Sequence, residues 1–397
     1  MSSATIVLIL FCVALAVSSV SFPFVLRFAK RHQIVDNPNV RKLQRVPVPV
    51  MGGTAVFLGI AVSIALAITV FQFHYLKSGI ICMTVMWLVG TWDDKADVPA
   101  MVRFVIETLL VWGLITFSEI GIMDFHGLWG LNEISLYYSV PLSVVAGVGI
   151  INAINLMDGV DGYCSGFAII ASLLYSILLF RAGNMAMGSF ALICVGALMP
   201  FVLHNVFGAT SKMFIGDGGS LMIGTALTVF IFRILATDSL CSTFAEDGLG
   251  LIPFTLSVLA IPVFDTLRVM IVRIARGNSP FHPDKTHLHH LFIEMGFSHI
   301  GTSCSIILIN TGIVAVWWLS YLLGASIDWQ FYIVVFLGMA ATFGFYRFMK
   351  VQQAYNDGVG TPLYLWFCKL GAHTHIERKG LWRCLQHVAD DILDVKE

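Results

Sequence analysis

Long apolar stretches alternate with short polar segments along the whole chain. About eleven of these stretches approach the roughly 20 residues that a helix needs to cross the hydrocarbon core of a bilayer. They cover approximately residues 4–26, 52–73, 79–92, 103–121, 137–156, 164–180, 185–204, 219–236, 251–270, 303–323 and 330–346. The pattern predicts an all-α fold, a polytopic integral membrane bundle with about eleven transmembrane helices.

The same pattern predicts the domain organisation. No soluble domain of useful size interrupts the stretches and no internal repeat is visible, so residues 1–346 are interpreted as one transmembrane domain. Residues 347–397 follow it as a cytoplasmic C-terminal tail. The first stretch lacks a basic segment before it and a small-residue cleavage site after it, which favours a retained helix over a signal peptide.

Composition agrees with a membrane protein. Hydrophobic residues make up 57% of the 397 residues and charged residues only 12%, which is too few to cover a soluble domain of this size. The chain has a formal net charge of −1, and nucleic acid is not an expected partner. The lipid bilayer is the partner that this composition predicts.

The basic residues predict the orientation, because short cytoplasmic loops are rich in Lys and Arg. With the N-terminus outside, 20 of the 23 Lys and Arg residues fall in the inner loops and the tail, and only Lys77, Arg181 and Arg233 fall on the outer side. This split predicts an N-out, C-in topology. Of the eight cysteines only Cys241 then lies in an outer loop, so no disulfide is expected there.

Five of the inner loops have an unusual polar content. They read "RKLQRVPVPVMGG" (41–53), "WDDKADVPA" (92–100), "MDGVDG" (157–162), "HNVFGATSKMFIGDGGS" (204–220) and "GNSPFHPDKTHLHH" (277–290). Because all five lie on one predicted face, a single site built from several helix ends is the simplest explanation.

Carboxylates are concentrated on this face. They are Asp93, Asp94, Asp97, Asp158, Asp161 and Asp217. Clustered carboxylates beside water suit a hard divalent cation such as Mg²⁺, which takes oxygen ligands and completes its octahedron with water and substrate phosphates. The alternatives are an N-cap role for Asp217 and ordinary solvated loop acids at Asp93 and Asp94.

The segment "NAINLMDGVDG" carries amides and acids at the end of an apolar stretch. Asn152, Asn155 and Asp158 are spaced by three, so on a helix they would form one polar stripe, which Asp161 extends if the last turn continues past Gly159. Polar groups inside a span normally face the bundle interior and mark a functional path. A purely structural role in helix packing is the alternative for the two asparagines.

The loop "PFHPDKTHLHH" contains four histidines within nine residues: His282, His287, His289 and His290. A zinc site is one interpretation. No cysteine lies nearby and the acids of the face are of the hard-cation type, which favours hydrogen bonding to a diphosphate instead. A pH-sensitive surface loop is a further alternative.

The first inner loop is basic and ends in glycines. Basic residues next to a span are usually topology determinants or contacts for anionic lipid. The glycines of "VMGG", Gly52 and Gly53, lie at a predicted helix start, where free N–H groups favour phosphate.

Taken together, these loops resemble those of the polyprenyl-phosphate N-acetylhexosamine-1-phosphate transferases, the glycosyltransferase 4 family. The matching features run in family order from residue 22 to about 300: "PVMGG", "DDKAD", "NAINLMDGVDG", "HN" before "FIGDGGS", and "PDKTHLHH". The last of these is similar to the WecA/TagO-like branch, whereas the related enzyme MraY has a run of three histidines in a differently flanked loop. The tail from Arg347 onward matches no family motif.

The resemblance implies a reaction. N-Acetylglucosamine-1-phosphate would pass from UDP-N-acetylglucosamine to undecaprenyl phosphate at the cytoplasmic face of a bacterial inner membrane, releasing UMP and starting a lipid-linked envelope glycan. Transfer of another N-acetylhexosamine-1-phosphate, or MraY-like transfer of phospho-MurNAc-pentapeptide, stays open, as does a homodimer.

The resemblance also implies metal and catalytic roles. Asp217 would be the main ligand of Mg²⁺, or of Mn²⁺ in its place, with Asp94 in support. Asp93 would deprotonate or orient the lipid phosphate, with Asp94 supporting it, or would act as a covalent nucleophile. His289 and His290 would steady the diphosphate.

Substrate-binding roles follow from the same resemblance. Asn155 and Asp158 would hold ribose or diphosphate groups, while Asp161 and Phe214 would receive the uracil. The remaining substrate-binding residues implied are Arg45, Asn205 and His287.

Two other classes are less consistent with the residues. A secondary transporter predicts polar groups near the bilayer midplane and two related halves, whereas the acids here crowd the inner helix ends. The CDP-alcohol phosphatidyltransferases place Ala-Arg two residues after Asp-Gly, whereas Asp158-Gly159 is followed by "VDGYC".

Overall fold

The computed structural model describes residues 2–37, 46–68, 76–96, 98–280, 284–355, 360–375 and 380–391. The first half contains α1 (Ser3–Arg31), β1 (Val35–Asp36), β2 (Val48–Pro49), α2 (Gly52–Ile68), α3 (Leu76–Ala96), α4 (Ala100–Ser118), the 3-10 turn η1 (Leu128–Gly130), α5 (Leu136–Leu156), α6 (Tyr163–Arg181) and α7 (Met185–Phe207). The second half contains α8 (Gly216–Ile234), α9 (Ser242–Glu246), α10 (Leu251–Val258), α11 (Ala260–Ala275), α12 (Leu288–Glu294), α13 (His299–Leu322), α14 (Ile327–Met339), the π-helical turn η2 (Ala340–Gly344), α15 (Phe345–Ala354), α16 (Pro362–Ala372) and α17 (Gly380–Asp391).

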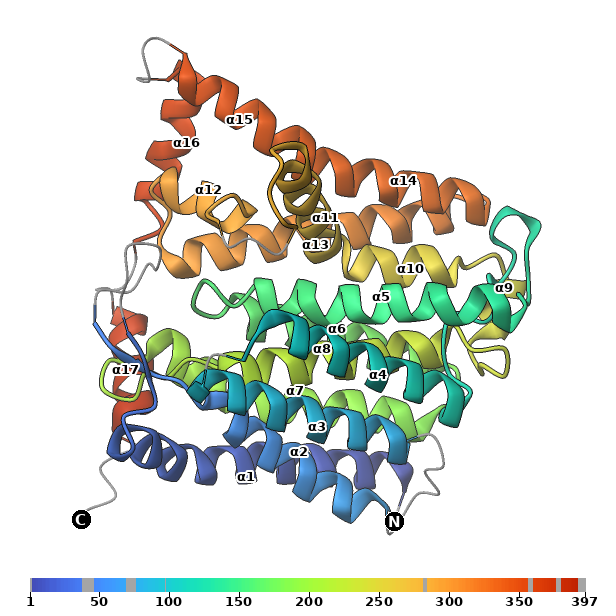
Figure 1. The fold of residues 1–397 in the computed structure, drawn as a ribbon, viewed down its shortest axis with the longest axis horizontal. Helices are drawn as coiled ribbons and strands as arrows, with labels where there is room; N and C mark the ends of the chain where they lie inside the picture. Colours follow the sequence, from blue (N-terminus) through green and yellow to red (C-terminus); the bar gives the residue numbers. More distant parts are fainter. Residues whose placement is uncertain are drawn as a thin grey trace.

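The long helices run side by side in one bundle, as the apolar stretches predict (Figure 1). Within the described residues, eight helices are long and apolar enough to cross a membrane, or nine if the bent pair α10 and α11 counts as one span. The all-α polytopic fold is therefore confirmed. Every one of the eleven predicted stretches overlaps a helix or this bent pair, and the count of eleven spans stays a prediction.

Helix α8 occupies the centre of the bundle, packed against α2, α3, α5 and α6. Its neighbours approach closely where a glycine faces the backbone of the adjacent helix. A Cβ on Gly53 of α2 would lie 2.3 Å from Cα of Gly219, and one on Gly224 would lie 2.8 Å from Cα of Ile151 in α5. Close backbone approach of this kind drives packing between helices in a membrane, where apolar side chains gain nothing by leaving lipid.

The predicted stretch 251–270 is not one continuous helix. The chain bends by 73° between α10 and α11. The physical reason is Pro262, which lacks an N–H and whose ring would clash with the carbonyl of Val258 four residues earlier. Asn310 of α13 satisfies the freed backbone groups: its Oδ1 accepts from the N–H of Ile261 at 2.9 Å and its Nδ2 donates to the Val258 carbonyl at 2.9 Å.

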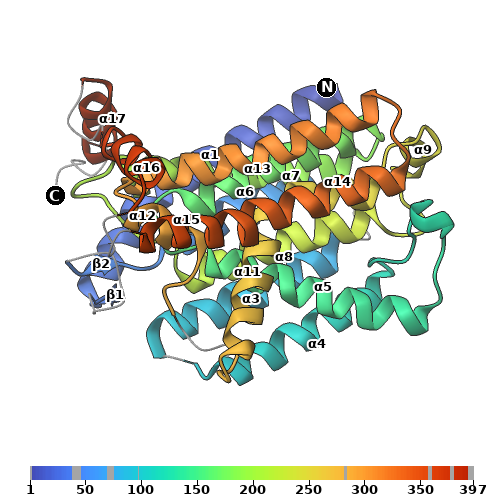
Figure 2. The same ribbon diagram turned by 90° about the horizontal axis from the view of Figure 1, so that it is seen from above.

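The short strands and the last helices gather at one end of the bundle. Both views place β1, β2, α12, α16 and α17 at this end, opposite α9 (Figures 1 and 2). The antiparallel pair β1–β2 joins Val35 to Pro49 and Asp36 to Val48. We call this the strand end of the bundle.

The N-out topology predicts that the strand end faces the cytoplasm. Cysteine introduced at Ser279 should therefore be protected from an impermeant thiol reagent in intact cells and should react after lysis. The native Cys241 cannot report the outer side, because its side chain is only 1% exposed. Cysteine at the exposed Glu246 in α9 is the matched outer position and should react in intact cells. Reaction of the cysteine at position 279 in intact cells, with protection of the one at position 246, would show that the topology is the opposite of the predicted one.

Candidate active site

A cleft of about 520 Å³ opens at the strand end of the bundle. Its wall comes from segments far apart in the sequence, including β1, the ends of α3 and α5, the loop before α8, and α12. The predicted site residues on this wall are Asp93, Asp94, Asn155, Asp158, Asp161, Asn205, Phe214, Asp217, His287, His289 and His290. Arg45, Asp97 and His282 lie outside the described residues.

Asp94 and Asp217 meet where α3 packs against the first turn of α8. The Asp94 carboxylate accepts from the N–H groups of Asp217 (2.8 Å) and Gly218 (3.2 Å). Asp94 thus satisfies two N–H groups that a helix N-terminus leaves without intrahelical partners. The N-cap interpretation of Asp217 is wrong: Ile215 holds the N-cap position without a side-chain bond, and Asp217 lies inside the helix and lines the cleft.

Asp93 is held by contacts on both of its oxygens. Its Oδ1 accepts from the N–H of Val98 at 2.7 Å, and its Oδ2 accepts from Arg103 Nη1 at 2.6 Å. The same Arg103 nitrogen lies 3.3 Å from Oδ2 of Asp217. One guanidinium of α4 therefore bridges the predicted catalytic acid and the predicted metal ligand.

A buried carboxylate lies behind Arg103. Glu107, one turn further along α4, is completely buried, and its Oε1 lies 3.8 Å from Nε of Arg103. Asn152 of α5 donates a hydrogen bond to the other oxygen of Glu107. Asn152 thus joins α5 to α4, whereas Asn155 lines the cleft.

The polar stripe predicted on α5 stops earlier than expected. Helix α5 ends at Leu156, so Asp158 and Asp161 lie in the following turn and not on a continued helix. Gly162 adopts a positive φ of 72°, which favours glycine and lets the chain reverse into α6. The turn carries both carboxylates to the cleft wall.

Asp161 is the centre of a small ionic cluster. Lys212 Nζ lies 2.6 Å from its Oδ2, and His299 Nδ1 lies 2.9 Å from the same oxygen. Burial by itself would raise the pKa of Asp161, but the hydrogen bond from His299 and the charge of Lys212 outweigh it and lower the pKa. Asp161 therefore carries a negative charge at neutral pH.

Asn205 and Phe214 connect this turn to the loop between α7 and α8, residues 208–215. Asn205 Oδ1 accepts from the N–H of Gly162 at 2.7 Å, and its Nδ2 donates to the Met213 carbonyl at 3.0 Å. The Lys212 ammonium lies 6.0 Å from the centre of the Phe214 ring, within the range of a cation–π contact.

The glycines of "VMGG" do not offer free N–H groups, so the phosphate interpretation of this pair is wrong. The N–H of Gly52 donates to the Phe214 carbonyl at 2.9 Å and that of Gly53 to the Ile215 carbonyl at 2.8 Å. A Cβ on Gly52 would lie 2.2 Å from the Phe201 ring, which explains the glycine by close packing.

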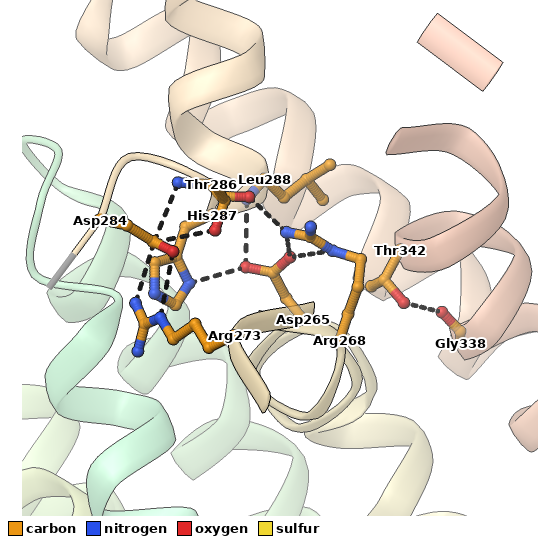
Figure 3. Close-up of polar contacts among 9 residues, drawn as sticks. All are labelled: Asp265, Arg268, Arg273, Asp284, Thr286, His287, Leu288, Gly338 and Thr342. Carbon is orange, nitrogen blue, oxygen red and sulfur yellow. Dashed lines mark hydrogen bonds and ion pairs between the residues drawn. The ribbon is translucent and has the colours of Figure 1, made fainter. Parts of the chain in front are cut away.

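The histidine loop is fixed by two carboxylates, shown in Figure 3. Asp265 of α11 binds Arg268 (2.6 Å) and, through its other oxygen, Nδ1 of His287 and the N–H of Leu288, both at 3.1 Å. Since a carboxylate only accepts, Nδ1 of His287 carries the proton, and Nε2 is buried without a partner in the described part of the chain.

The second carboxylate holds the start of this loop. Asp284 forms a bidentate pair with Arg273 of α11, at 2.9 and 3.1 Å (Figure 3). Burial opposes ionisation of Asp284, but the hydrogen bonds from Arg273 and Thr286 lower its pKa well below its usual value. The pair therefore stays ionised and anchors the loop to α11.

The two remaining histidines are neutral at physiological pH. Burial, with the neighbouring His290 and His287, lowers the pKa of His289 well below its ordinary value. Burial, with the neighbouring His287 and Lys285, lowers the pKa of His290 to about 4. A Cβ on Gly159 would lie 2.7 Å from Nε2 of His289, so this ring lies directly against the turn that carries Asp158 and Asp161.

Comparison with known proteins agrees with this geometry. Residues 76–235 match the model of glycosyl transferase family 4. The undecaprenyl-phosphate alpha-N-acetylglucosaminyl 1-phosphate transferase of Yersinia pestis is 30% identical over 285 residues, covering 70% of this chain and 75% of that protein. The chain belongs to glycosyl transferase family 4.

Two further relatives of this family 4 transferase carry similar names. The probable undecaprenyl-phosphate N-acetylglucosaminyl 1-phosphate transferase of Bacillus subtilis (strain 168) is 30% identical over 296 residues, covering 74% of this chain and 79% of that protein. The undecaprenyl-phosphate alpha-N-acetylglucosaminyl 1-phosphate transferase of Escherichia coli (strain K12) is 28% identical over 283 residues, covering 69% of this chain and 73% of that protein.

The cleft of the family 4 transferase is lined by carboxylate oxygens, which are the kind of ligand that Mg²⁺ binds. The carboxylates of Asp93, Asp94, Asp158 and Asp217 all line it. Within the described residues no group of three or more His, Cys, Asp or Glu side chains is arranged to hold an ion alone. Mg²⁺ usually takes one or two protein carboxylates and completes its shell with water and substrate phosphates.

Sequence reasoning missed several residues of the family 4 site. Arg103 is one of the 20 basic residues on which the predicted topology rests, and no role in the site was predicted for it. The Arg103–Glu107 pair, at i and i+4 in a predicted span, is itself a signal of a buried polar function. Lys212 and His299 had no signal in the sequence, because their partner Asp161 is 51 and 138 residues away.

Proposed function

We propose that this enzyme transfers N-acetylglucosamine-1-phosphate from UDP-N-acetylglucosamine to undecaprenyl phosphate, on the cytoplasmic face of a bacterial inner membrane. The observation that carries the proposal is the convergence of Asp93, Asp94, Asp158 and Asp217 in one cleft at a helix-bundle end, beside the Asp161 cluster. The names of the relatives support the donor and the acceptor. The distribution of basic residues supports the cytoplasmic face.

We assign the nucleotide of the donor to the Asp161 cluster. Lys212 and His299 both contact Oδ2 of Asp161, so we assign Oδ1 to accept from N3–H of uracil. The Phe214 ring on the same wall would stack on the base. Asn155 and Asp158 would hold the ribose or the diphosphate, with Nε2 of His287 as a further polar contact.

We assign the acceptor phosphate to Asp93 and Arg103. An oxygen of the lipid phosphate attacks the β-phosphorus of the donor, the bond from that phosphorus to the bridging oxygen breaks, and UMP leaves. Both reactants are anions, so the enzyme must neutralise charge and align the attacking and leaving oxygens. Arg103 supplies a positive charge between Asp93 and Asp217.

Asp217, supported by Asp94, would hold the divalent cation. When bound, Mg²⁺ or Mn²⁺ supplies charge neutralisation at the donor diphosphate. Asp94 also fixes the backbone of Asp217 and Gly218, which sets the direction of the Asp217 side chain.

The direct test uses membranes that contain the protein, undecaprenyl phosphate and a panel of UDP-sugars labelled in the sugar. We expect UDP-N-acetylglucosamine to give lipid-extractable label together with an equal amount of UMP. Membranes without the protein are the background control. If only a different UDP-sugar gave lipid-extractable label, the proposed donor would be wrong. If no UDP-sugar gave lipid-extractable label, the proposed function would be overturned.

Replacement of Asp161 by Ala should raise the KM for the UDP-sugar about tenfold and leave kcat nearly unchanged, because a uracil contact is the same in the ground and transition states. Steady-state kinetics at saturating lipid phosphate measures both constants. Asp247→Ala, at an exposed aspartate on the α9 side of the bundle, is the matched control. A loss confined to kcat would move the nucleotide away from Asp161.

A further inference from the structure

The tail contacts the two segments that carry Lys212 and His299, through helix α17 and through the residues after α16, although neither helix lines the cleft. Both helices lie at the strand end of the bundle (Figures 1 and 2). Helix α17 touches the loop that carries Lys212, and the segment after α16 touches the start of α13, which carries His299.

Helix α17 holds the α7–α8 loop through one carboxylate. Asp390 Oδ1 accepts from three successive N–H groups, those of Ala209 (3.2 Å), Thr210 (3.1 Å) and Ser211 (3.0 Å). Trp382 packs its ring 4.7 Å from that of Phe207 at the end of α7. Both an apolar and a polar contact therefore dock this helix.

The Asp390 contact has a clear electrostatic cause. Partial burial works to raise the pKa of Asp390, but the hydrogen bonds from the N–H groups of Ser211 and Ala209 outweigh it and lower the pKa. An ionised carboxylate is the acceptor that best satisfies converging N–H groups. Lys212, which binds Asp161, directly follows residues 209–211, whose N–H groups donate to Asp390.

The segment after α16 holds the start of α13 in a similar way. Thr374 Oγ1 accepts from the N–H of Ser298, and the Thr374 carbonyl accepts from the Ser298 hydroxyl, both at 2.9 Å. Ser298 is the N-cap of α13, and its hydroxyl also accepts from the N–H of Gly301. A Cβ on Gly301 would lie 2.4 Å from Thr374, so the contact is tight.

We propose that the tail positions the two side chains that hold Asp161, with Asp390 acting through Lys212 and Thr374 acting through His299, and so sets the affinity for the nucleotide end of the donor. The inference rests on the proposed function, because it takes the Asp161 cluster as the uracil site. Asp390 and Thr374 are positioning residues and touch no substrate.

A local mechanism supports this role. Lys212 and His299 each reach Asp161 from a segment end, Lys212 from a loop and His299 from the first residue of α13. Loops and helix ends are the parts of a fold that open most easily. The tail contacts hold the backbone of the α7–α8 loop and of the start of α13 in place before UMP binds. UMP binding then costs less conformational entropy, so the affinity for UMP rises without a new contact to UMP.

The experiment measures the dissociation constant of UMP for the purified full-length protein in lipid nanodiscs with Mg²⁺, and the steady-state constants of the same variants. Asp390→Ala should weaken UMP binding and raise the KM for the UDP-sugar roughly three- to tenfold. The kcat and the KM for the lipid phosphate should not change. Asp391→Ala removes an exposed neighbouring charge of the same helix and is the matched control.

A conservative variant separates positioning from general stability. Oδ1 of Asp390 accepts all three hydrogen bonds, so Asp390→Asn can keep them and should bind UMP within about twofold of the parent protein. Thr374→Val and Thr374→Ser form the equivalent pair on the other side. If Asp390→Ala does not fold, the comparison of Thr374→Val with Thr374→Ser tests whether the tail sets the affinity for UMP.

A double-mutant cycle tests whether Asp390 acts through Lys212. In a Lys212→Ala background the effect of Asp390→Ala should disappear, because the group through which Asp390 acts is gone. Additive effects would overturn this route. Equal UMP affinity of the parent protein, Asp390→Ala and Thr374→Val would overturn the role of the tail, whereas a parent protein that binds no UMP would overturn the proposed function itself.

Discussion

Replacement of Asp217 by Asn is expected to lower kcat by about 100-fold or more while the protein still folds and inserts into the membrane. Asp217 lies at the second position of α8, with its backbone N–H bound by Asp94 and its carboxylate directed to the cleft beside Arg103. The amide keeps the shape of the side chain but removes the negative charge that we assign to the divalent cation. The backbone contacts of Asp94 do not depend on that charge.

The measurement is turnover in membranes at increasing Mg²⁺ and in EDTA. We expect EDTA to abolish the activity of the parent protein, and Mg²⁺ or Mn²⁺ to restore it. Size-exclusion chromatography of the solubilised Asp217→Asn protein serves as the folding control. Full turnover in EDTA, or normal kcat in this variant, would remove the metal from the mechanism.

Replacement of Gly90 by Ala is expected to lower kcat about 100-fold without changing any polar residue, because a displacement of about 1 Å at the reacting groups costs that much. A Cβ on Gly90 would lie 2.4 Å from the carbonyl carbon and oxygen of Asp217 and 2.5 Å from the N of Gly218. These are backbone atoms of α8, so α3 and α8 must separate. Asp94 then no longer reaches the N–H groups that it caps.

Gly149→Ala is the matched control for this variant, since a Cβ on that glycine of α5 meets no atom within 4 Å. Both variants should be measured for kcat and for thermal stability, where overpacking at Gly90 should cost about 1–3 kcal/mol. Equal activity of the two proteins would show that the contact between α3 and α8 does not set the geometry of the site.

The amount of the site that could be predicted differs from one residue to the next. The acids at the ends of apolar stretches, such as Asp93 and Asp217, are visible in the sequence because carboxylates in or beside a span usually have a functional role. Arg103 and Glu107 were overlooked as functional residues, although both lie within a predicted span. Lys212 and His299 resemble any other loop residue until the fold brings them to Asp161.

The glycines show the same difference. "VMGG" was interpreted as a phosphate-binding helix start, since glycine there leaves N–H groups accessible. In the fold these N–H groups pair with the carbonyls of Phe214 and Ile215, and the glycines permit α2 to approach α7 and α8. A glycine in the sequence indicates only that a side chain is absent at that position. The atoms that leave no room for a side chain belong to distant parts of the chain and are known only from the fold.

By itself, the sequence determined the membrane class, the approximate position of every long helix and the polar loops that belong together. These properties depend on local composition and on the thickness of a bilayer, which are the same wherever a segment lies in the fold. Only the tertiary structure decided the break between α10 and α11, the Asp94 cap on α8, the Arg103 bridge and the contacts of the tail with the segments that carry Lys212 and His299. Each of these is a contact between groups distant in sequence, and its geometry is fixed by the packing of whole helices.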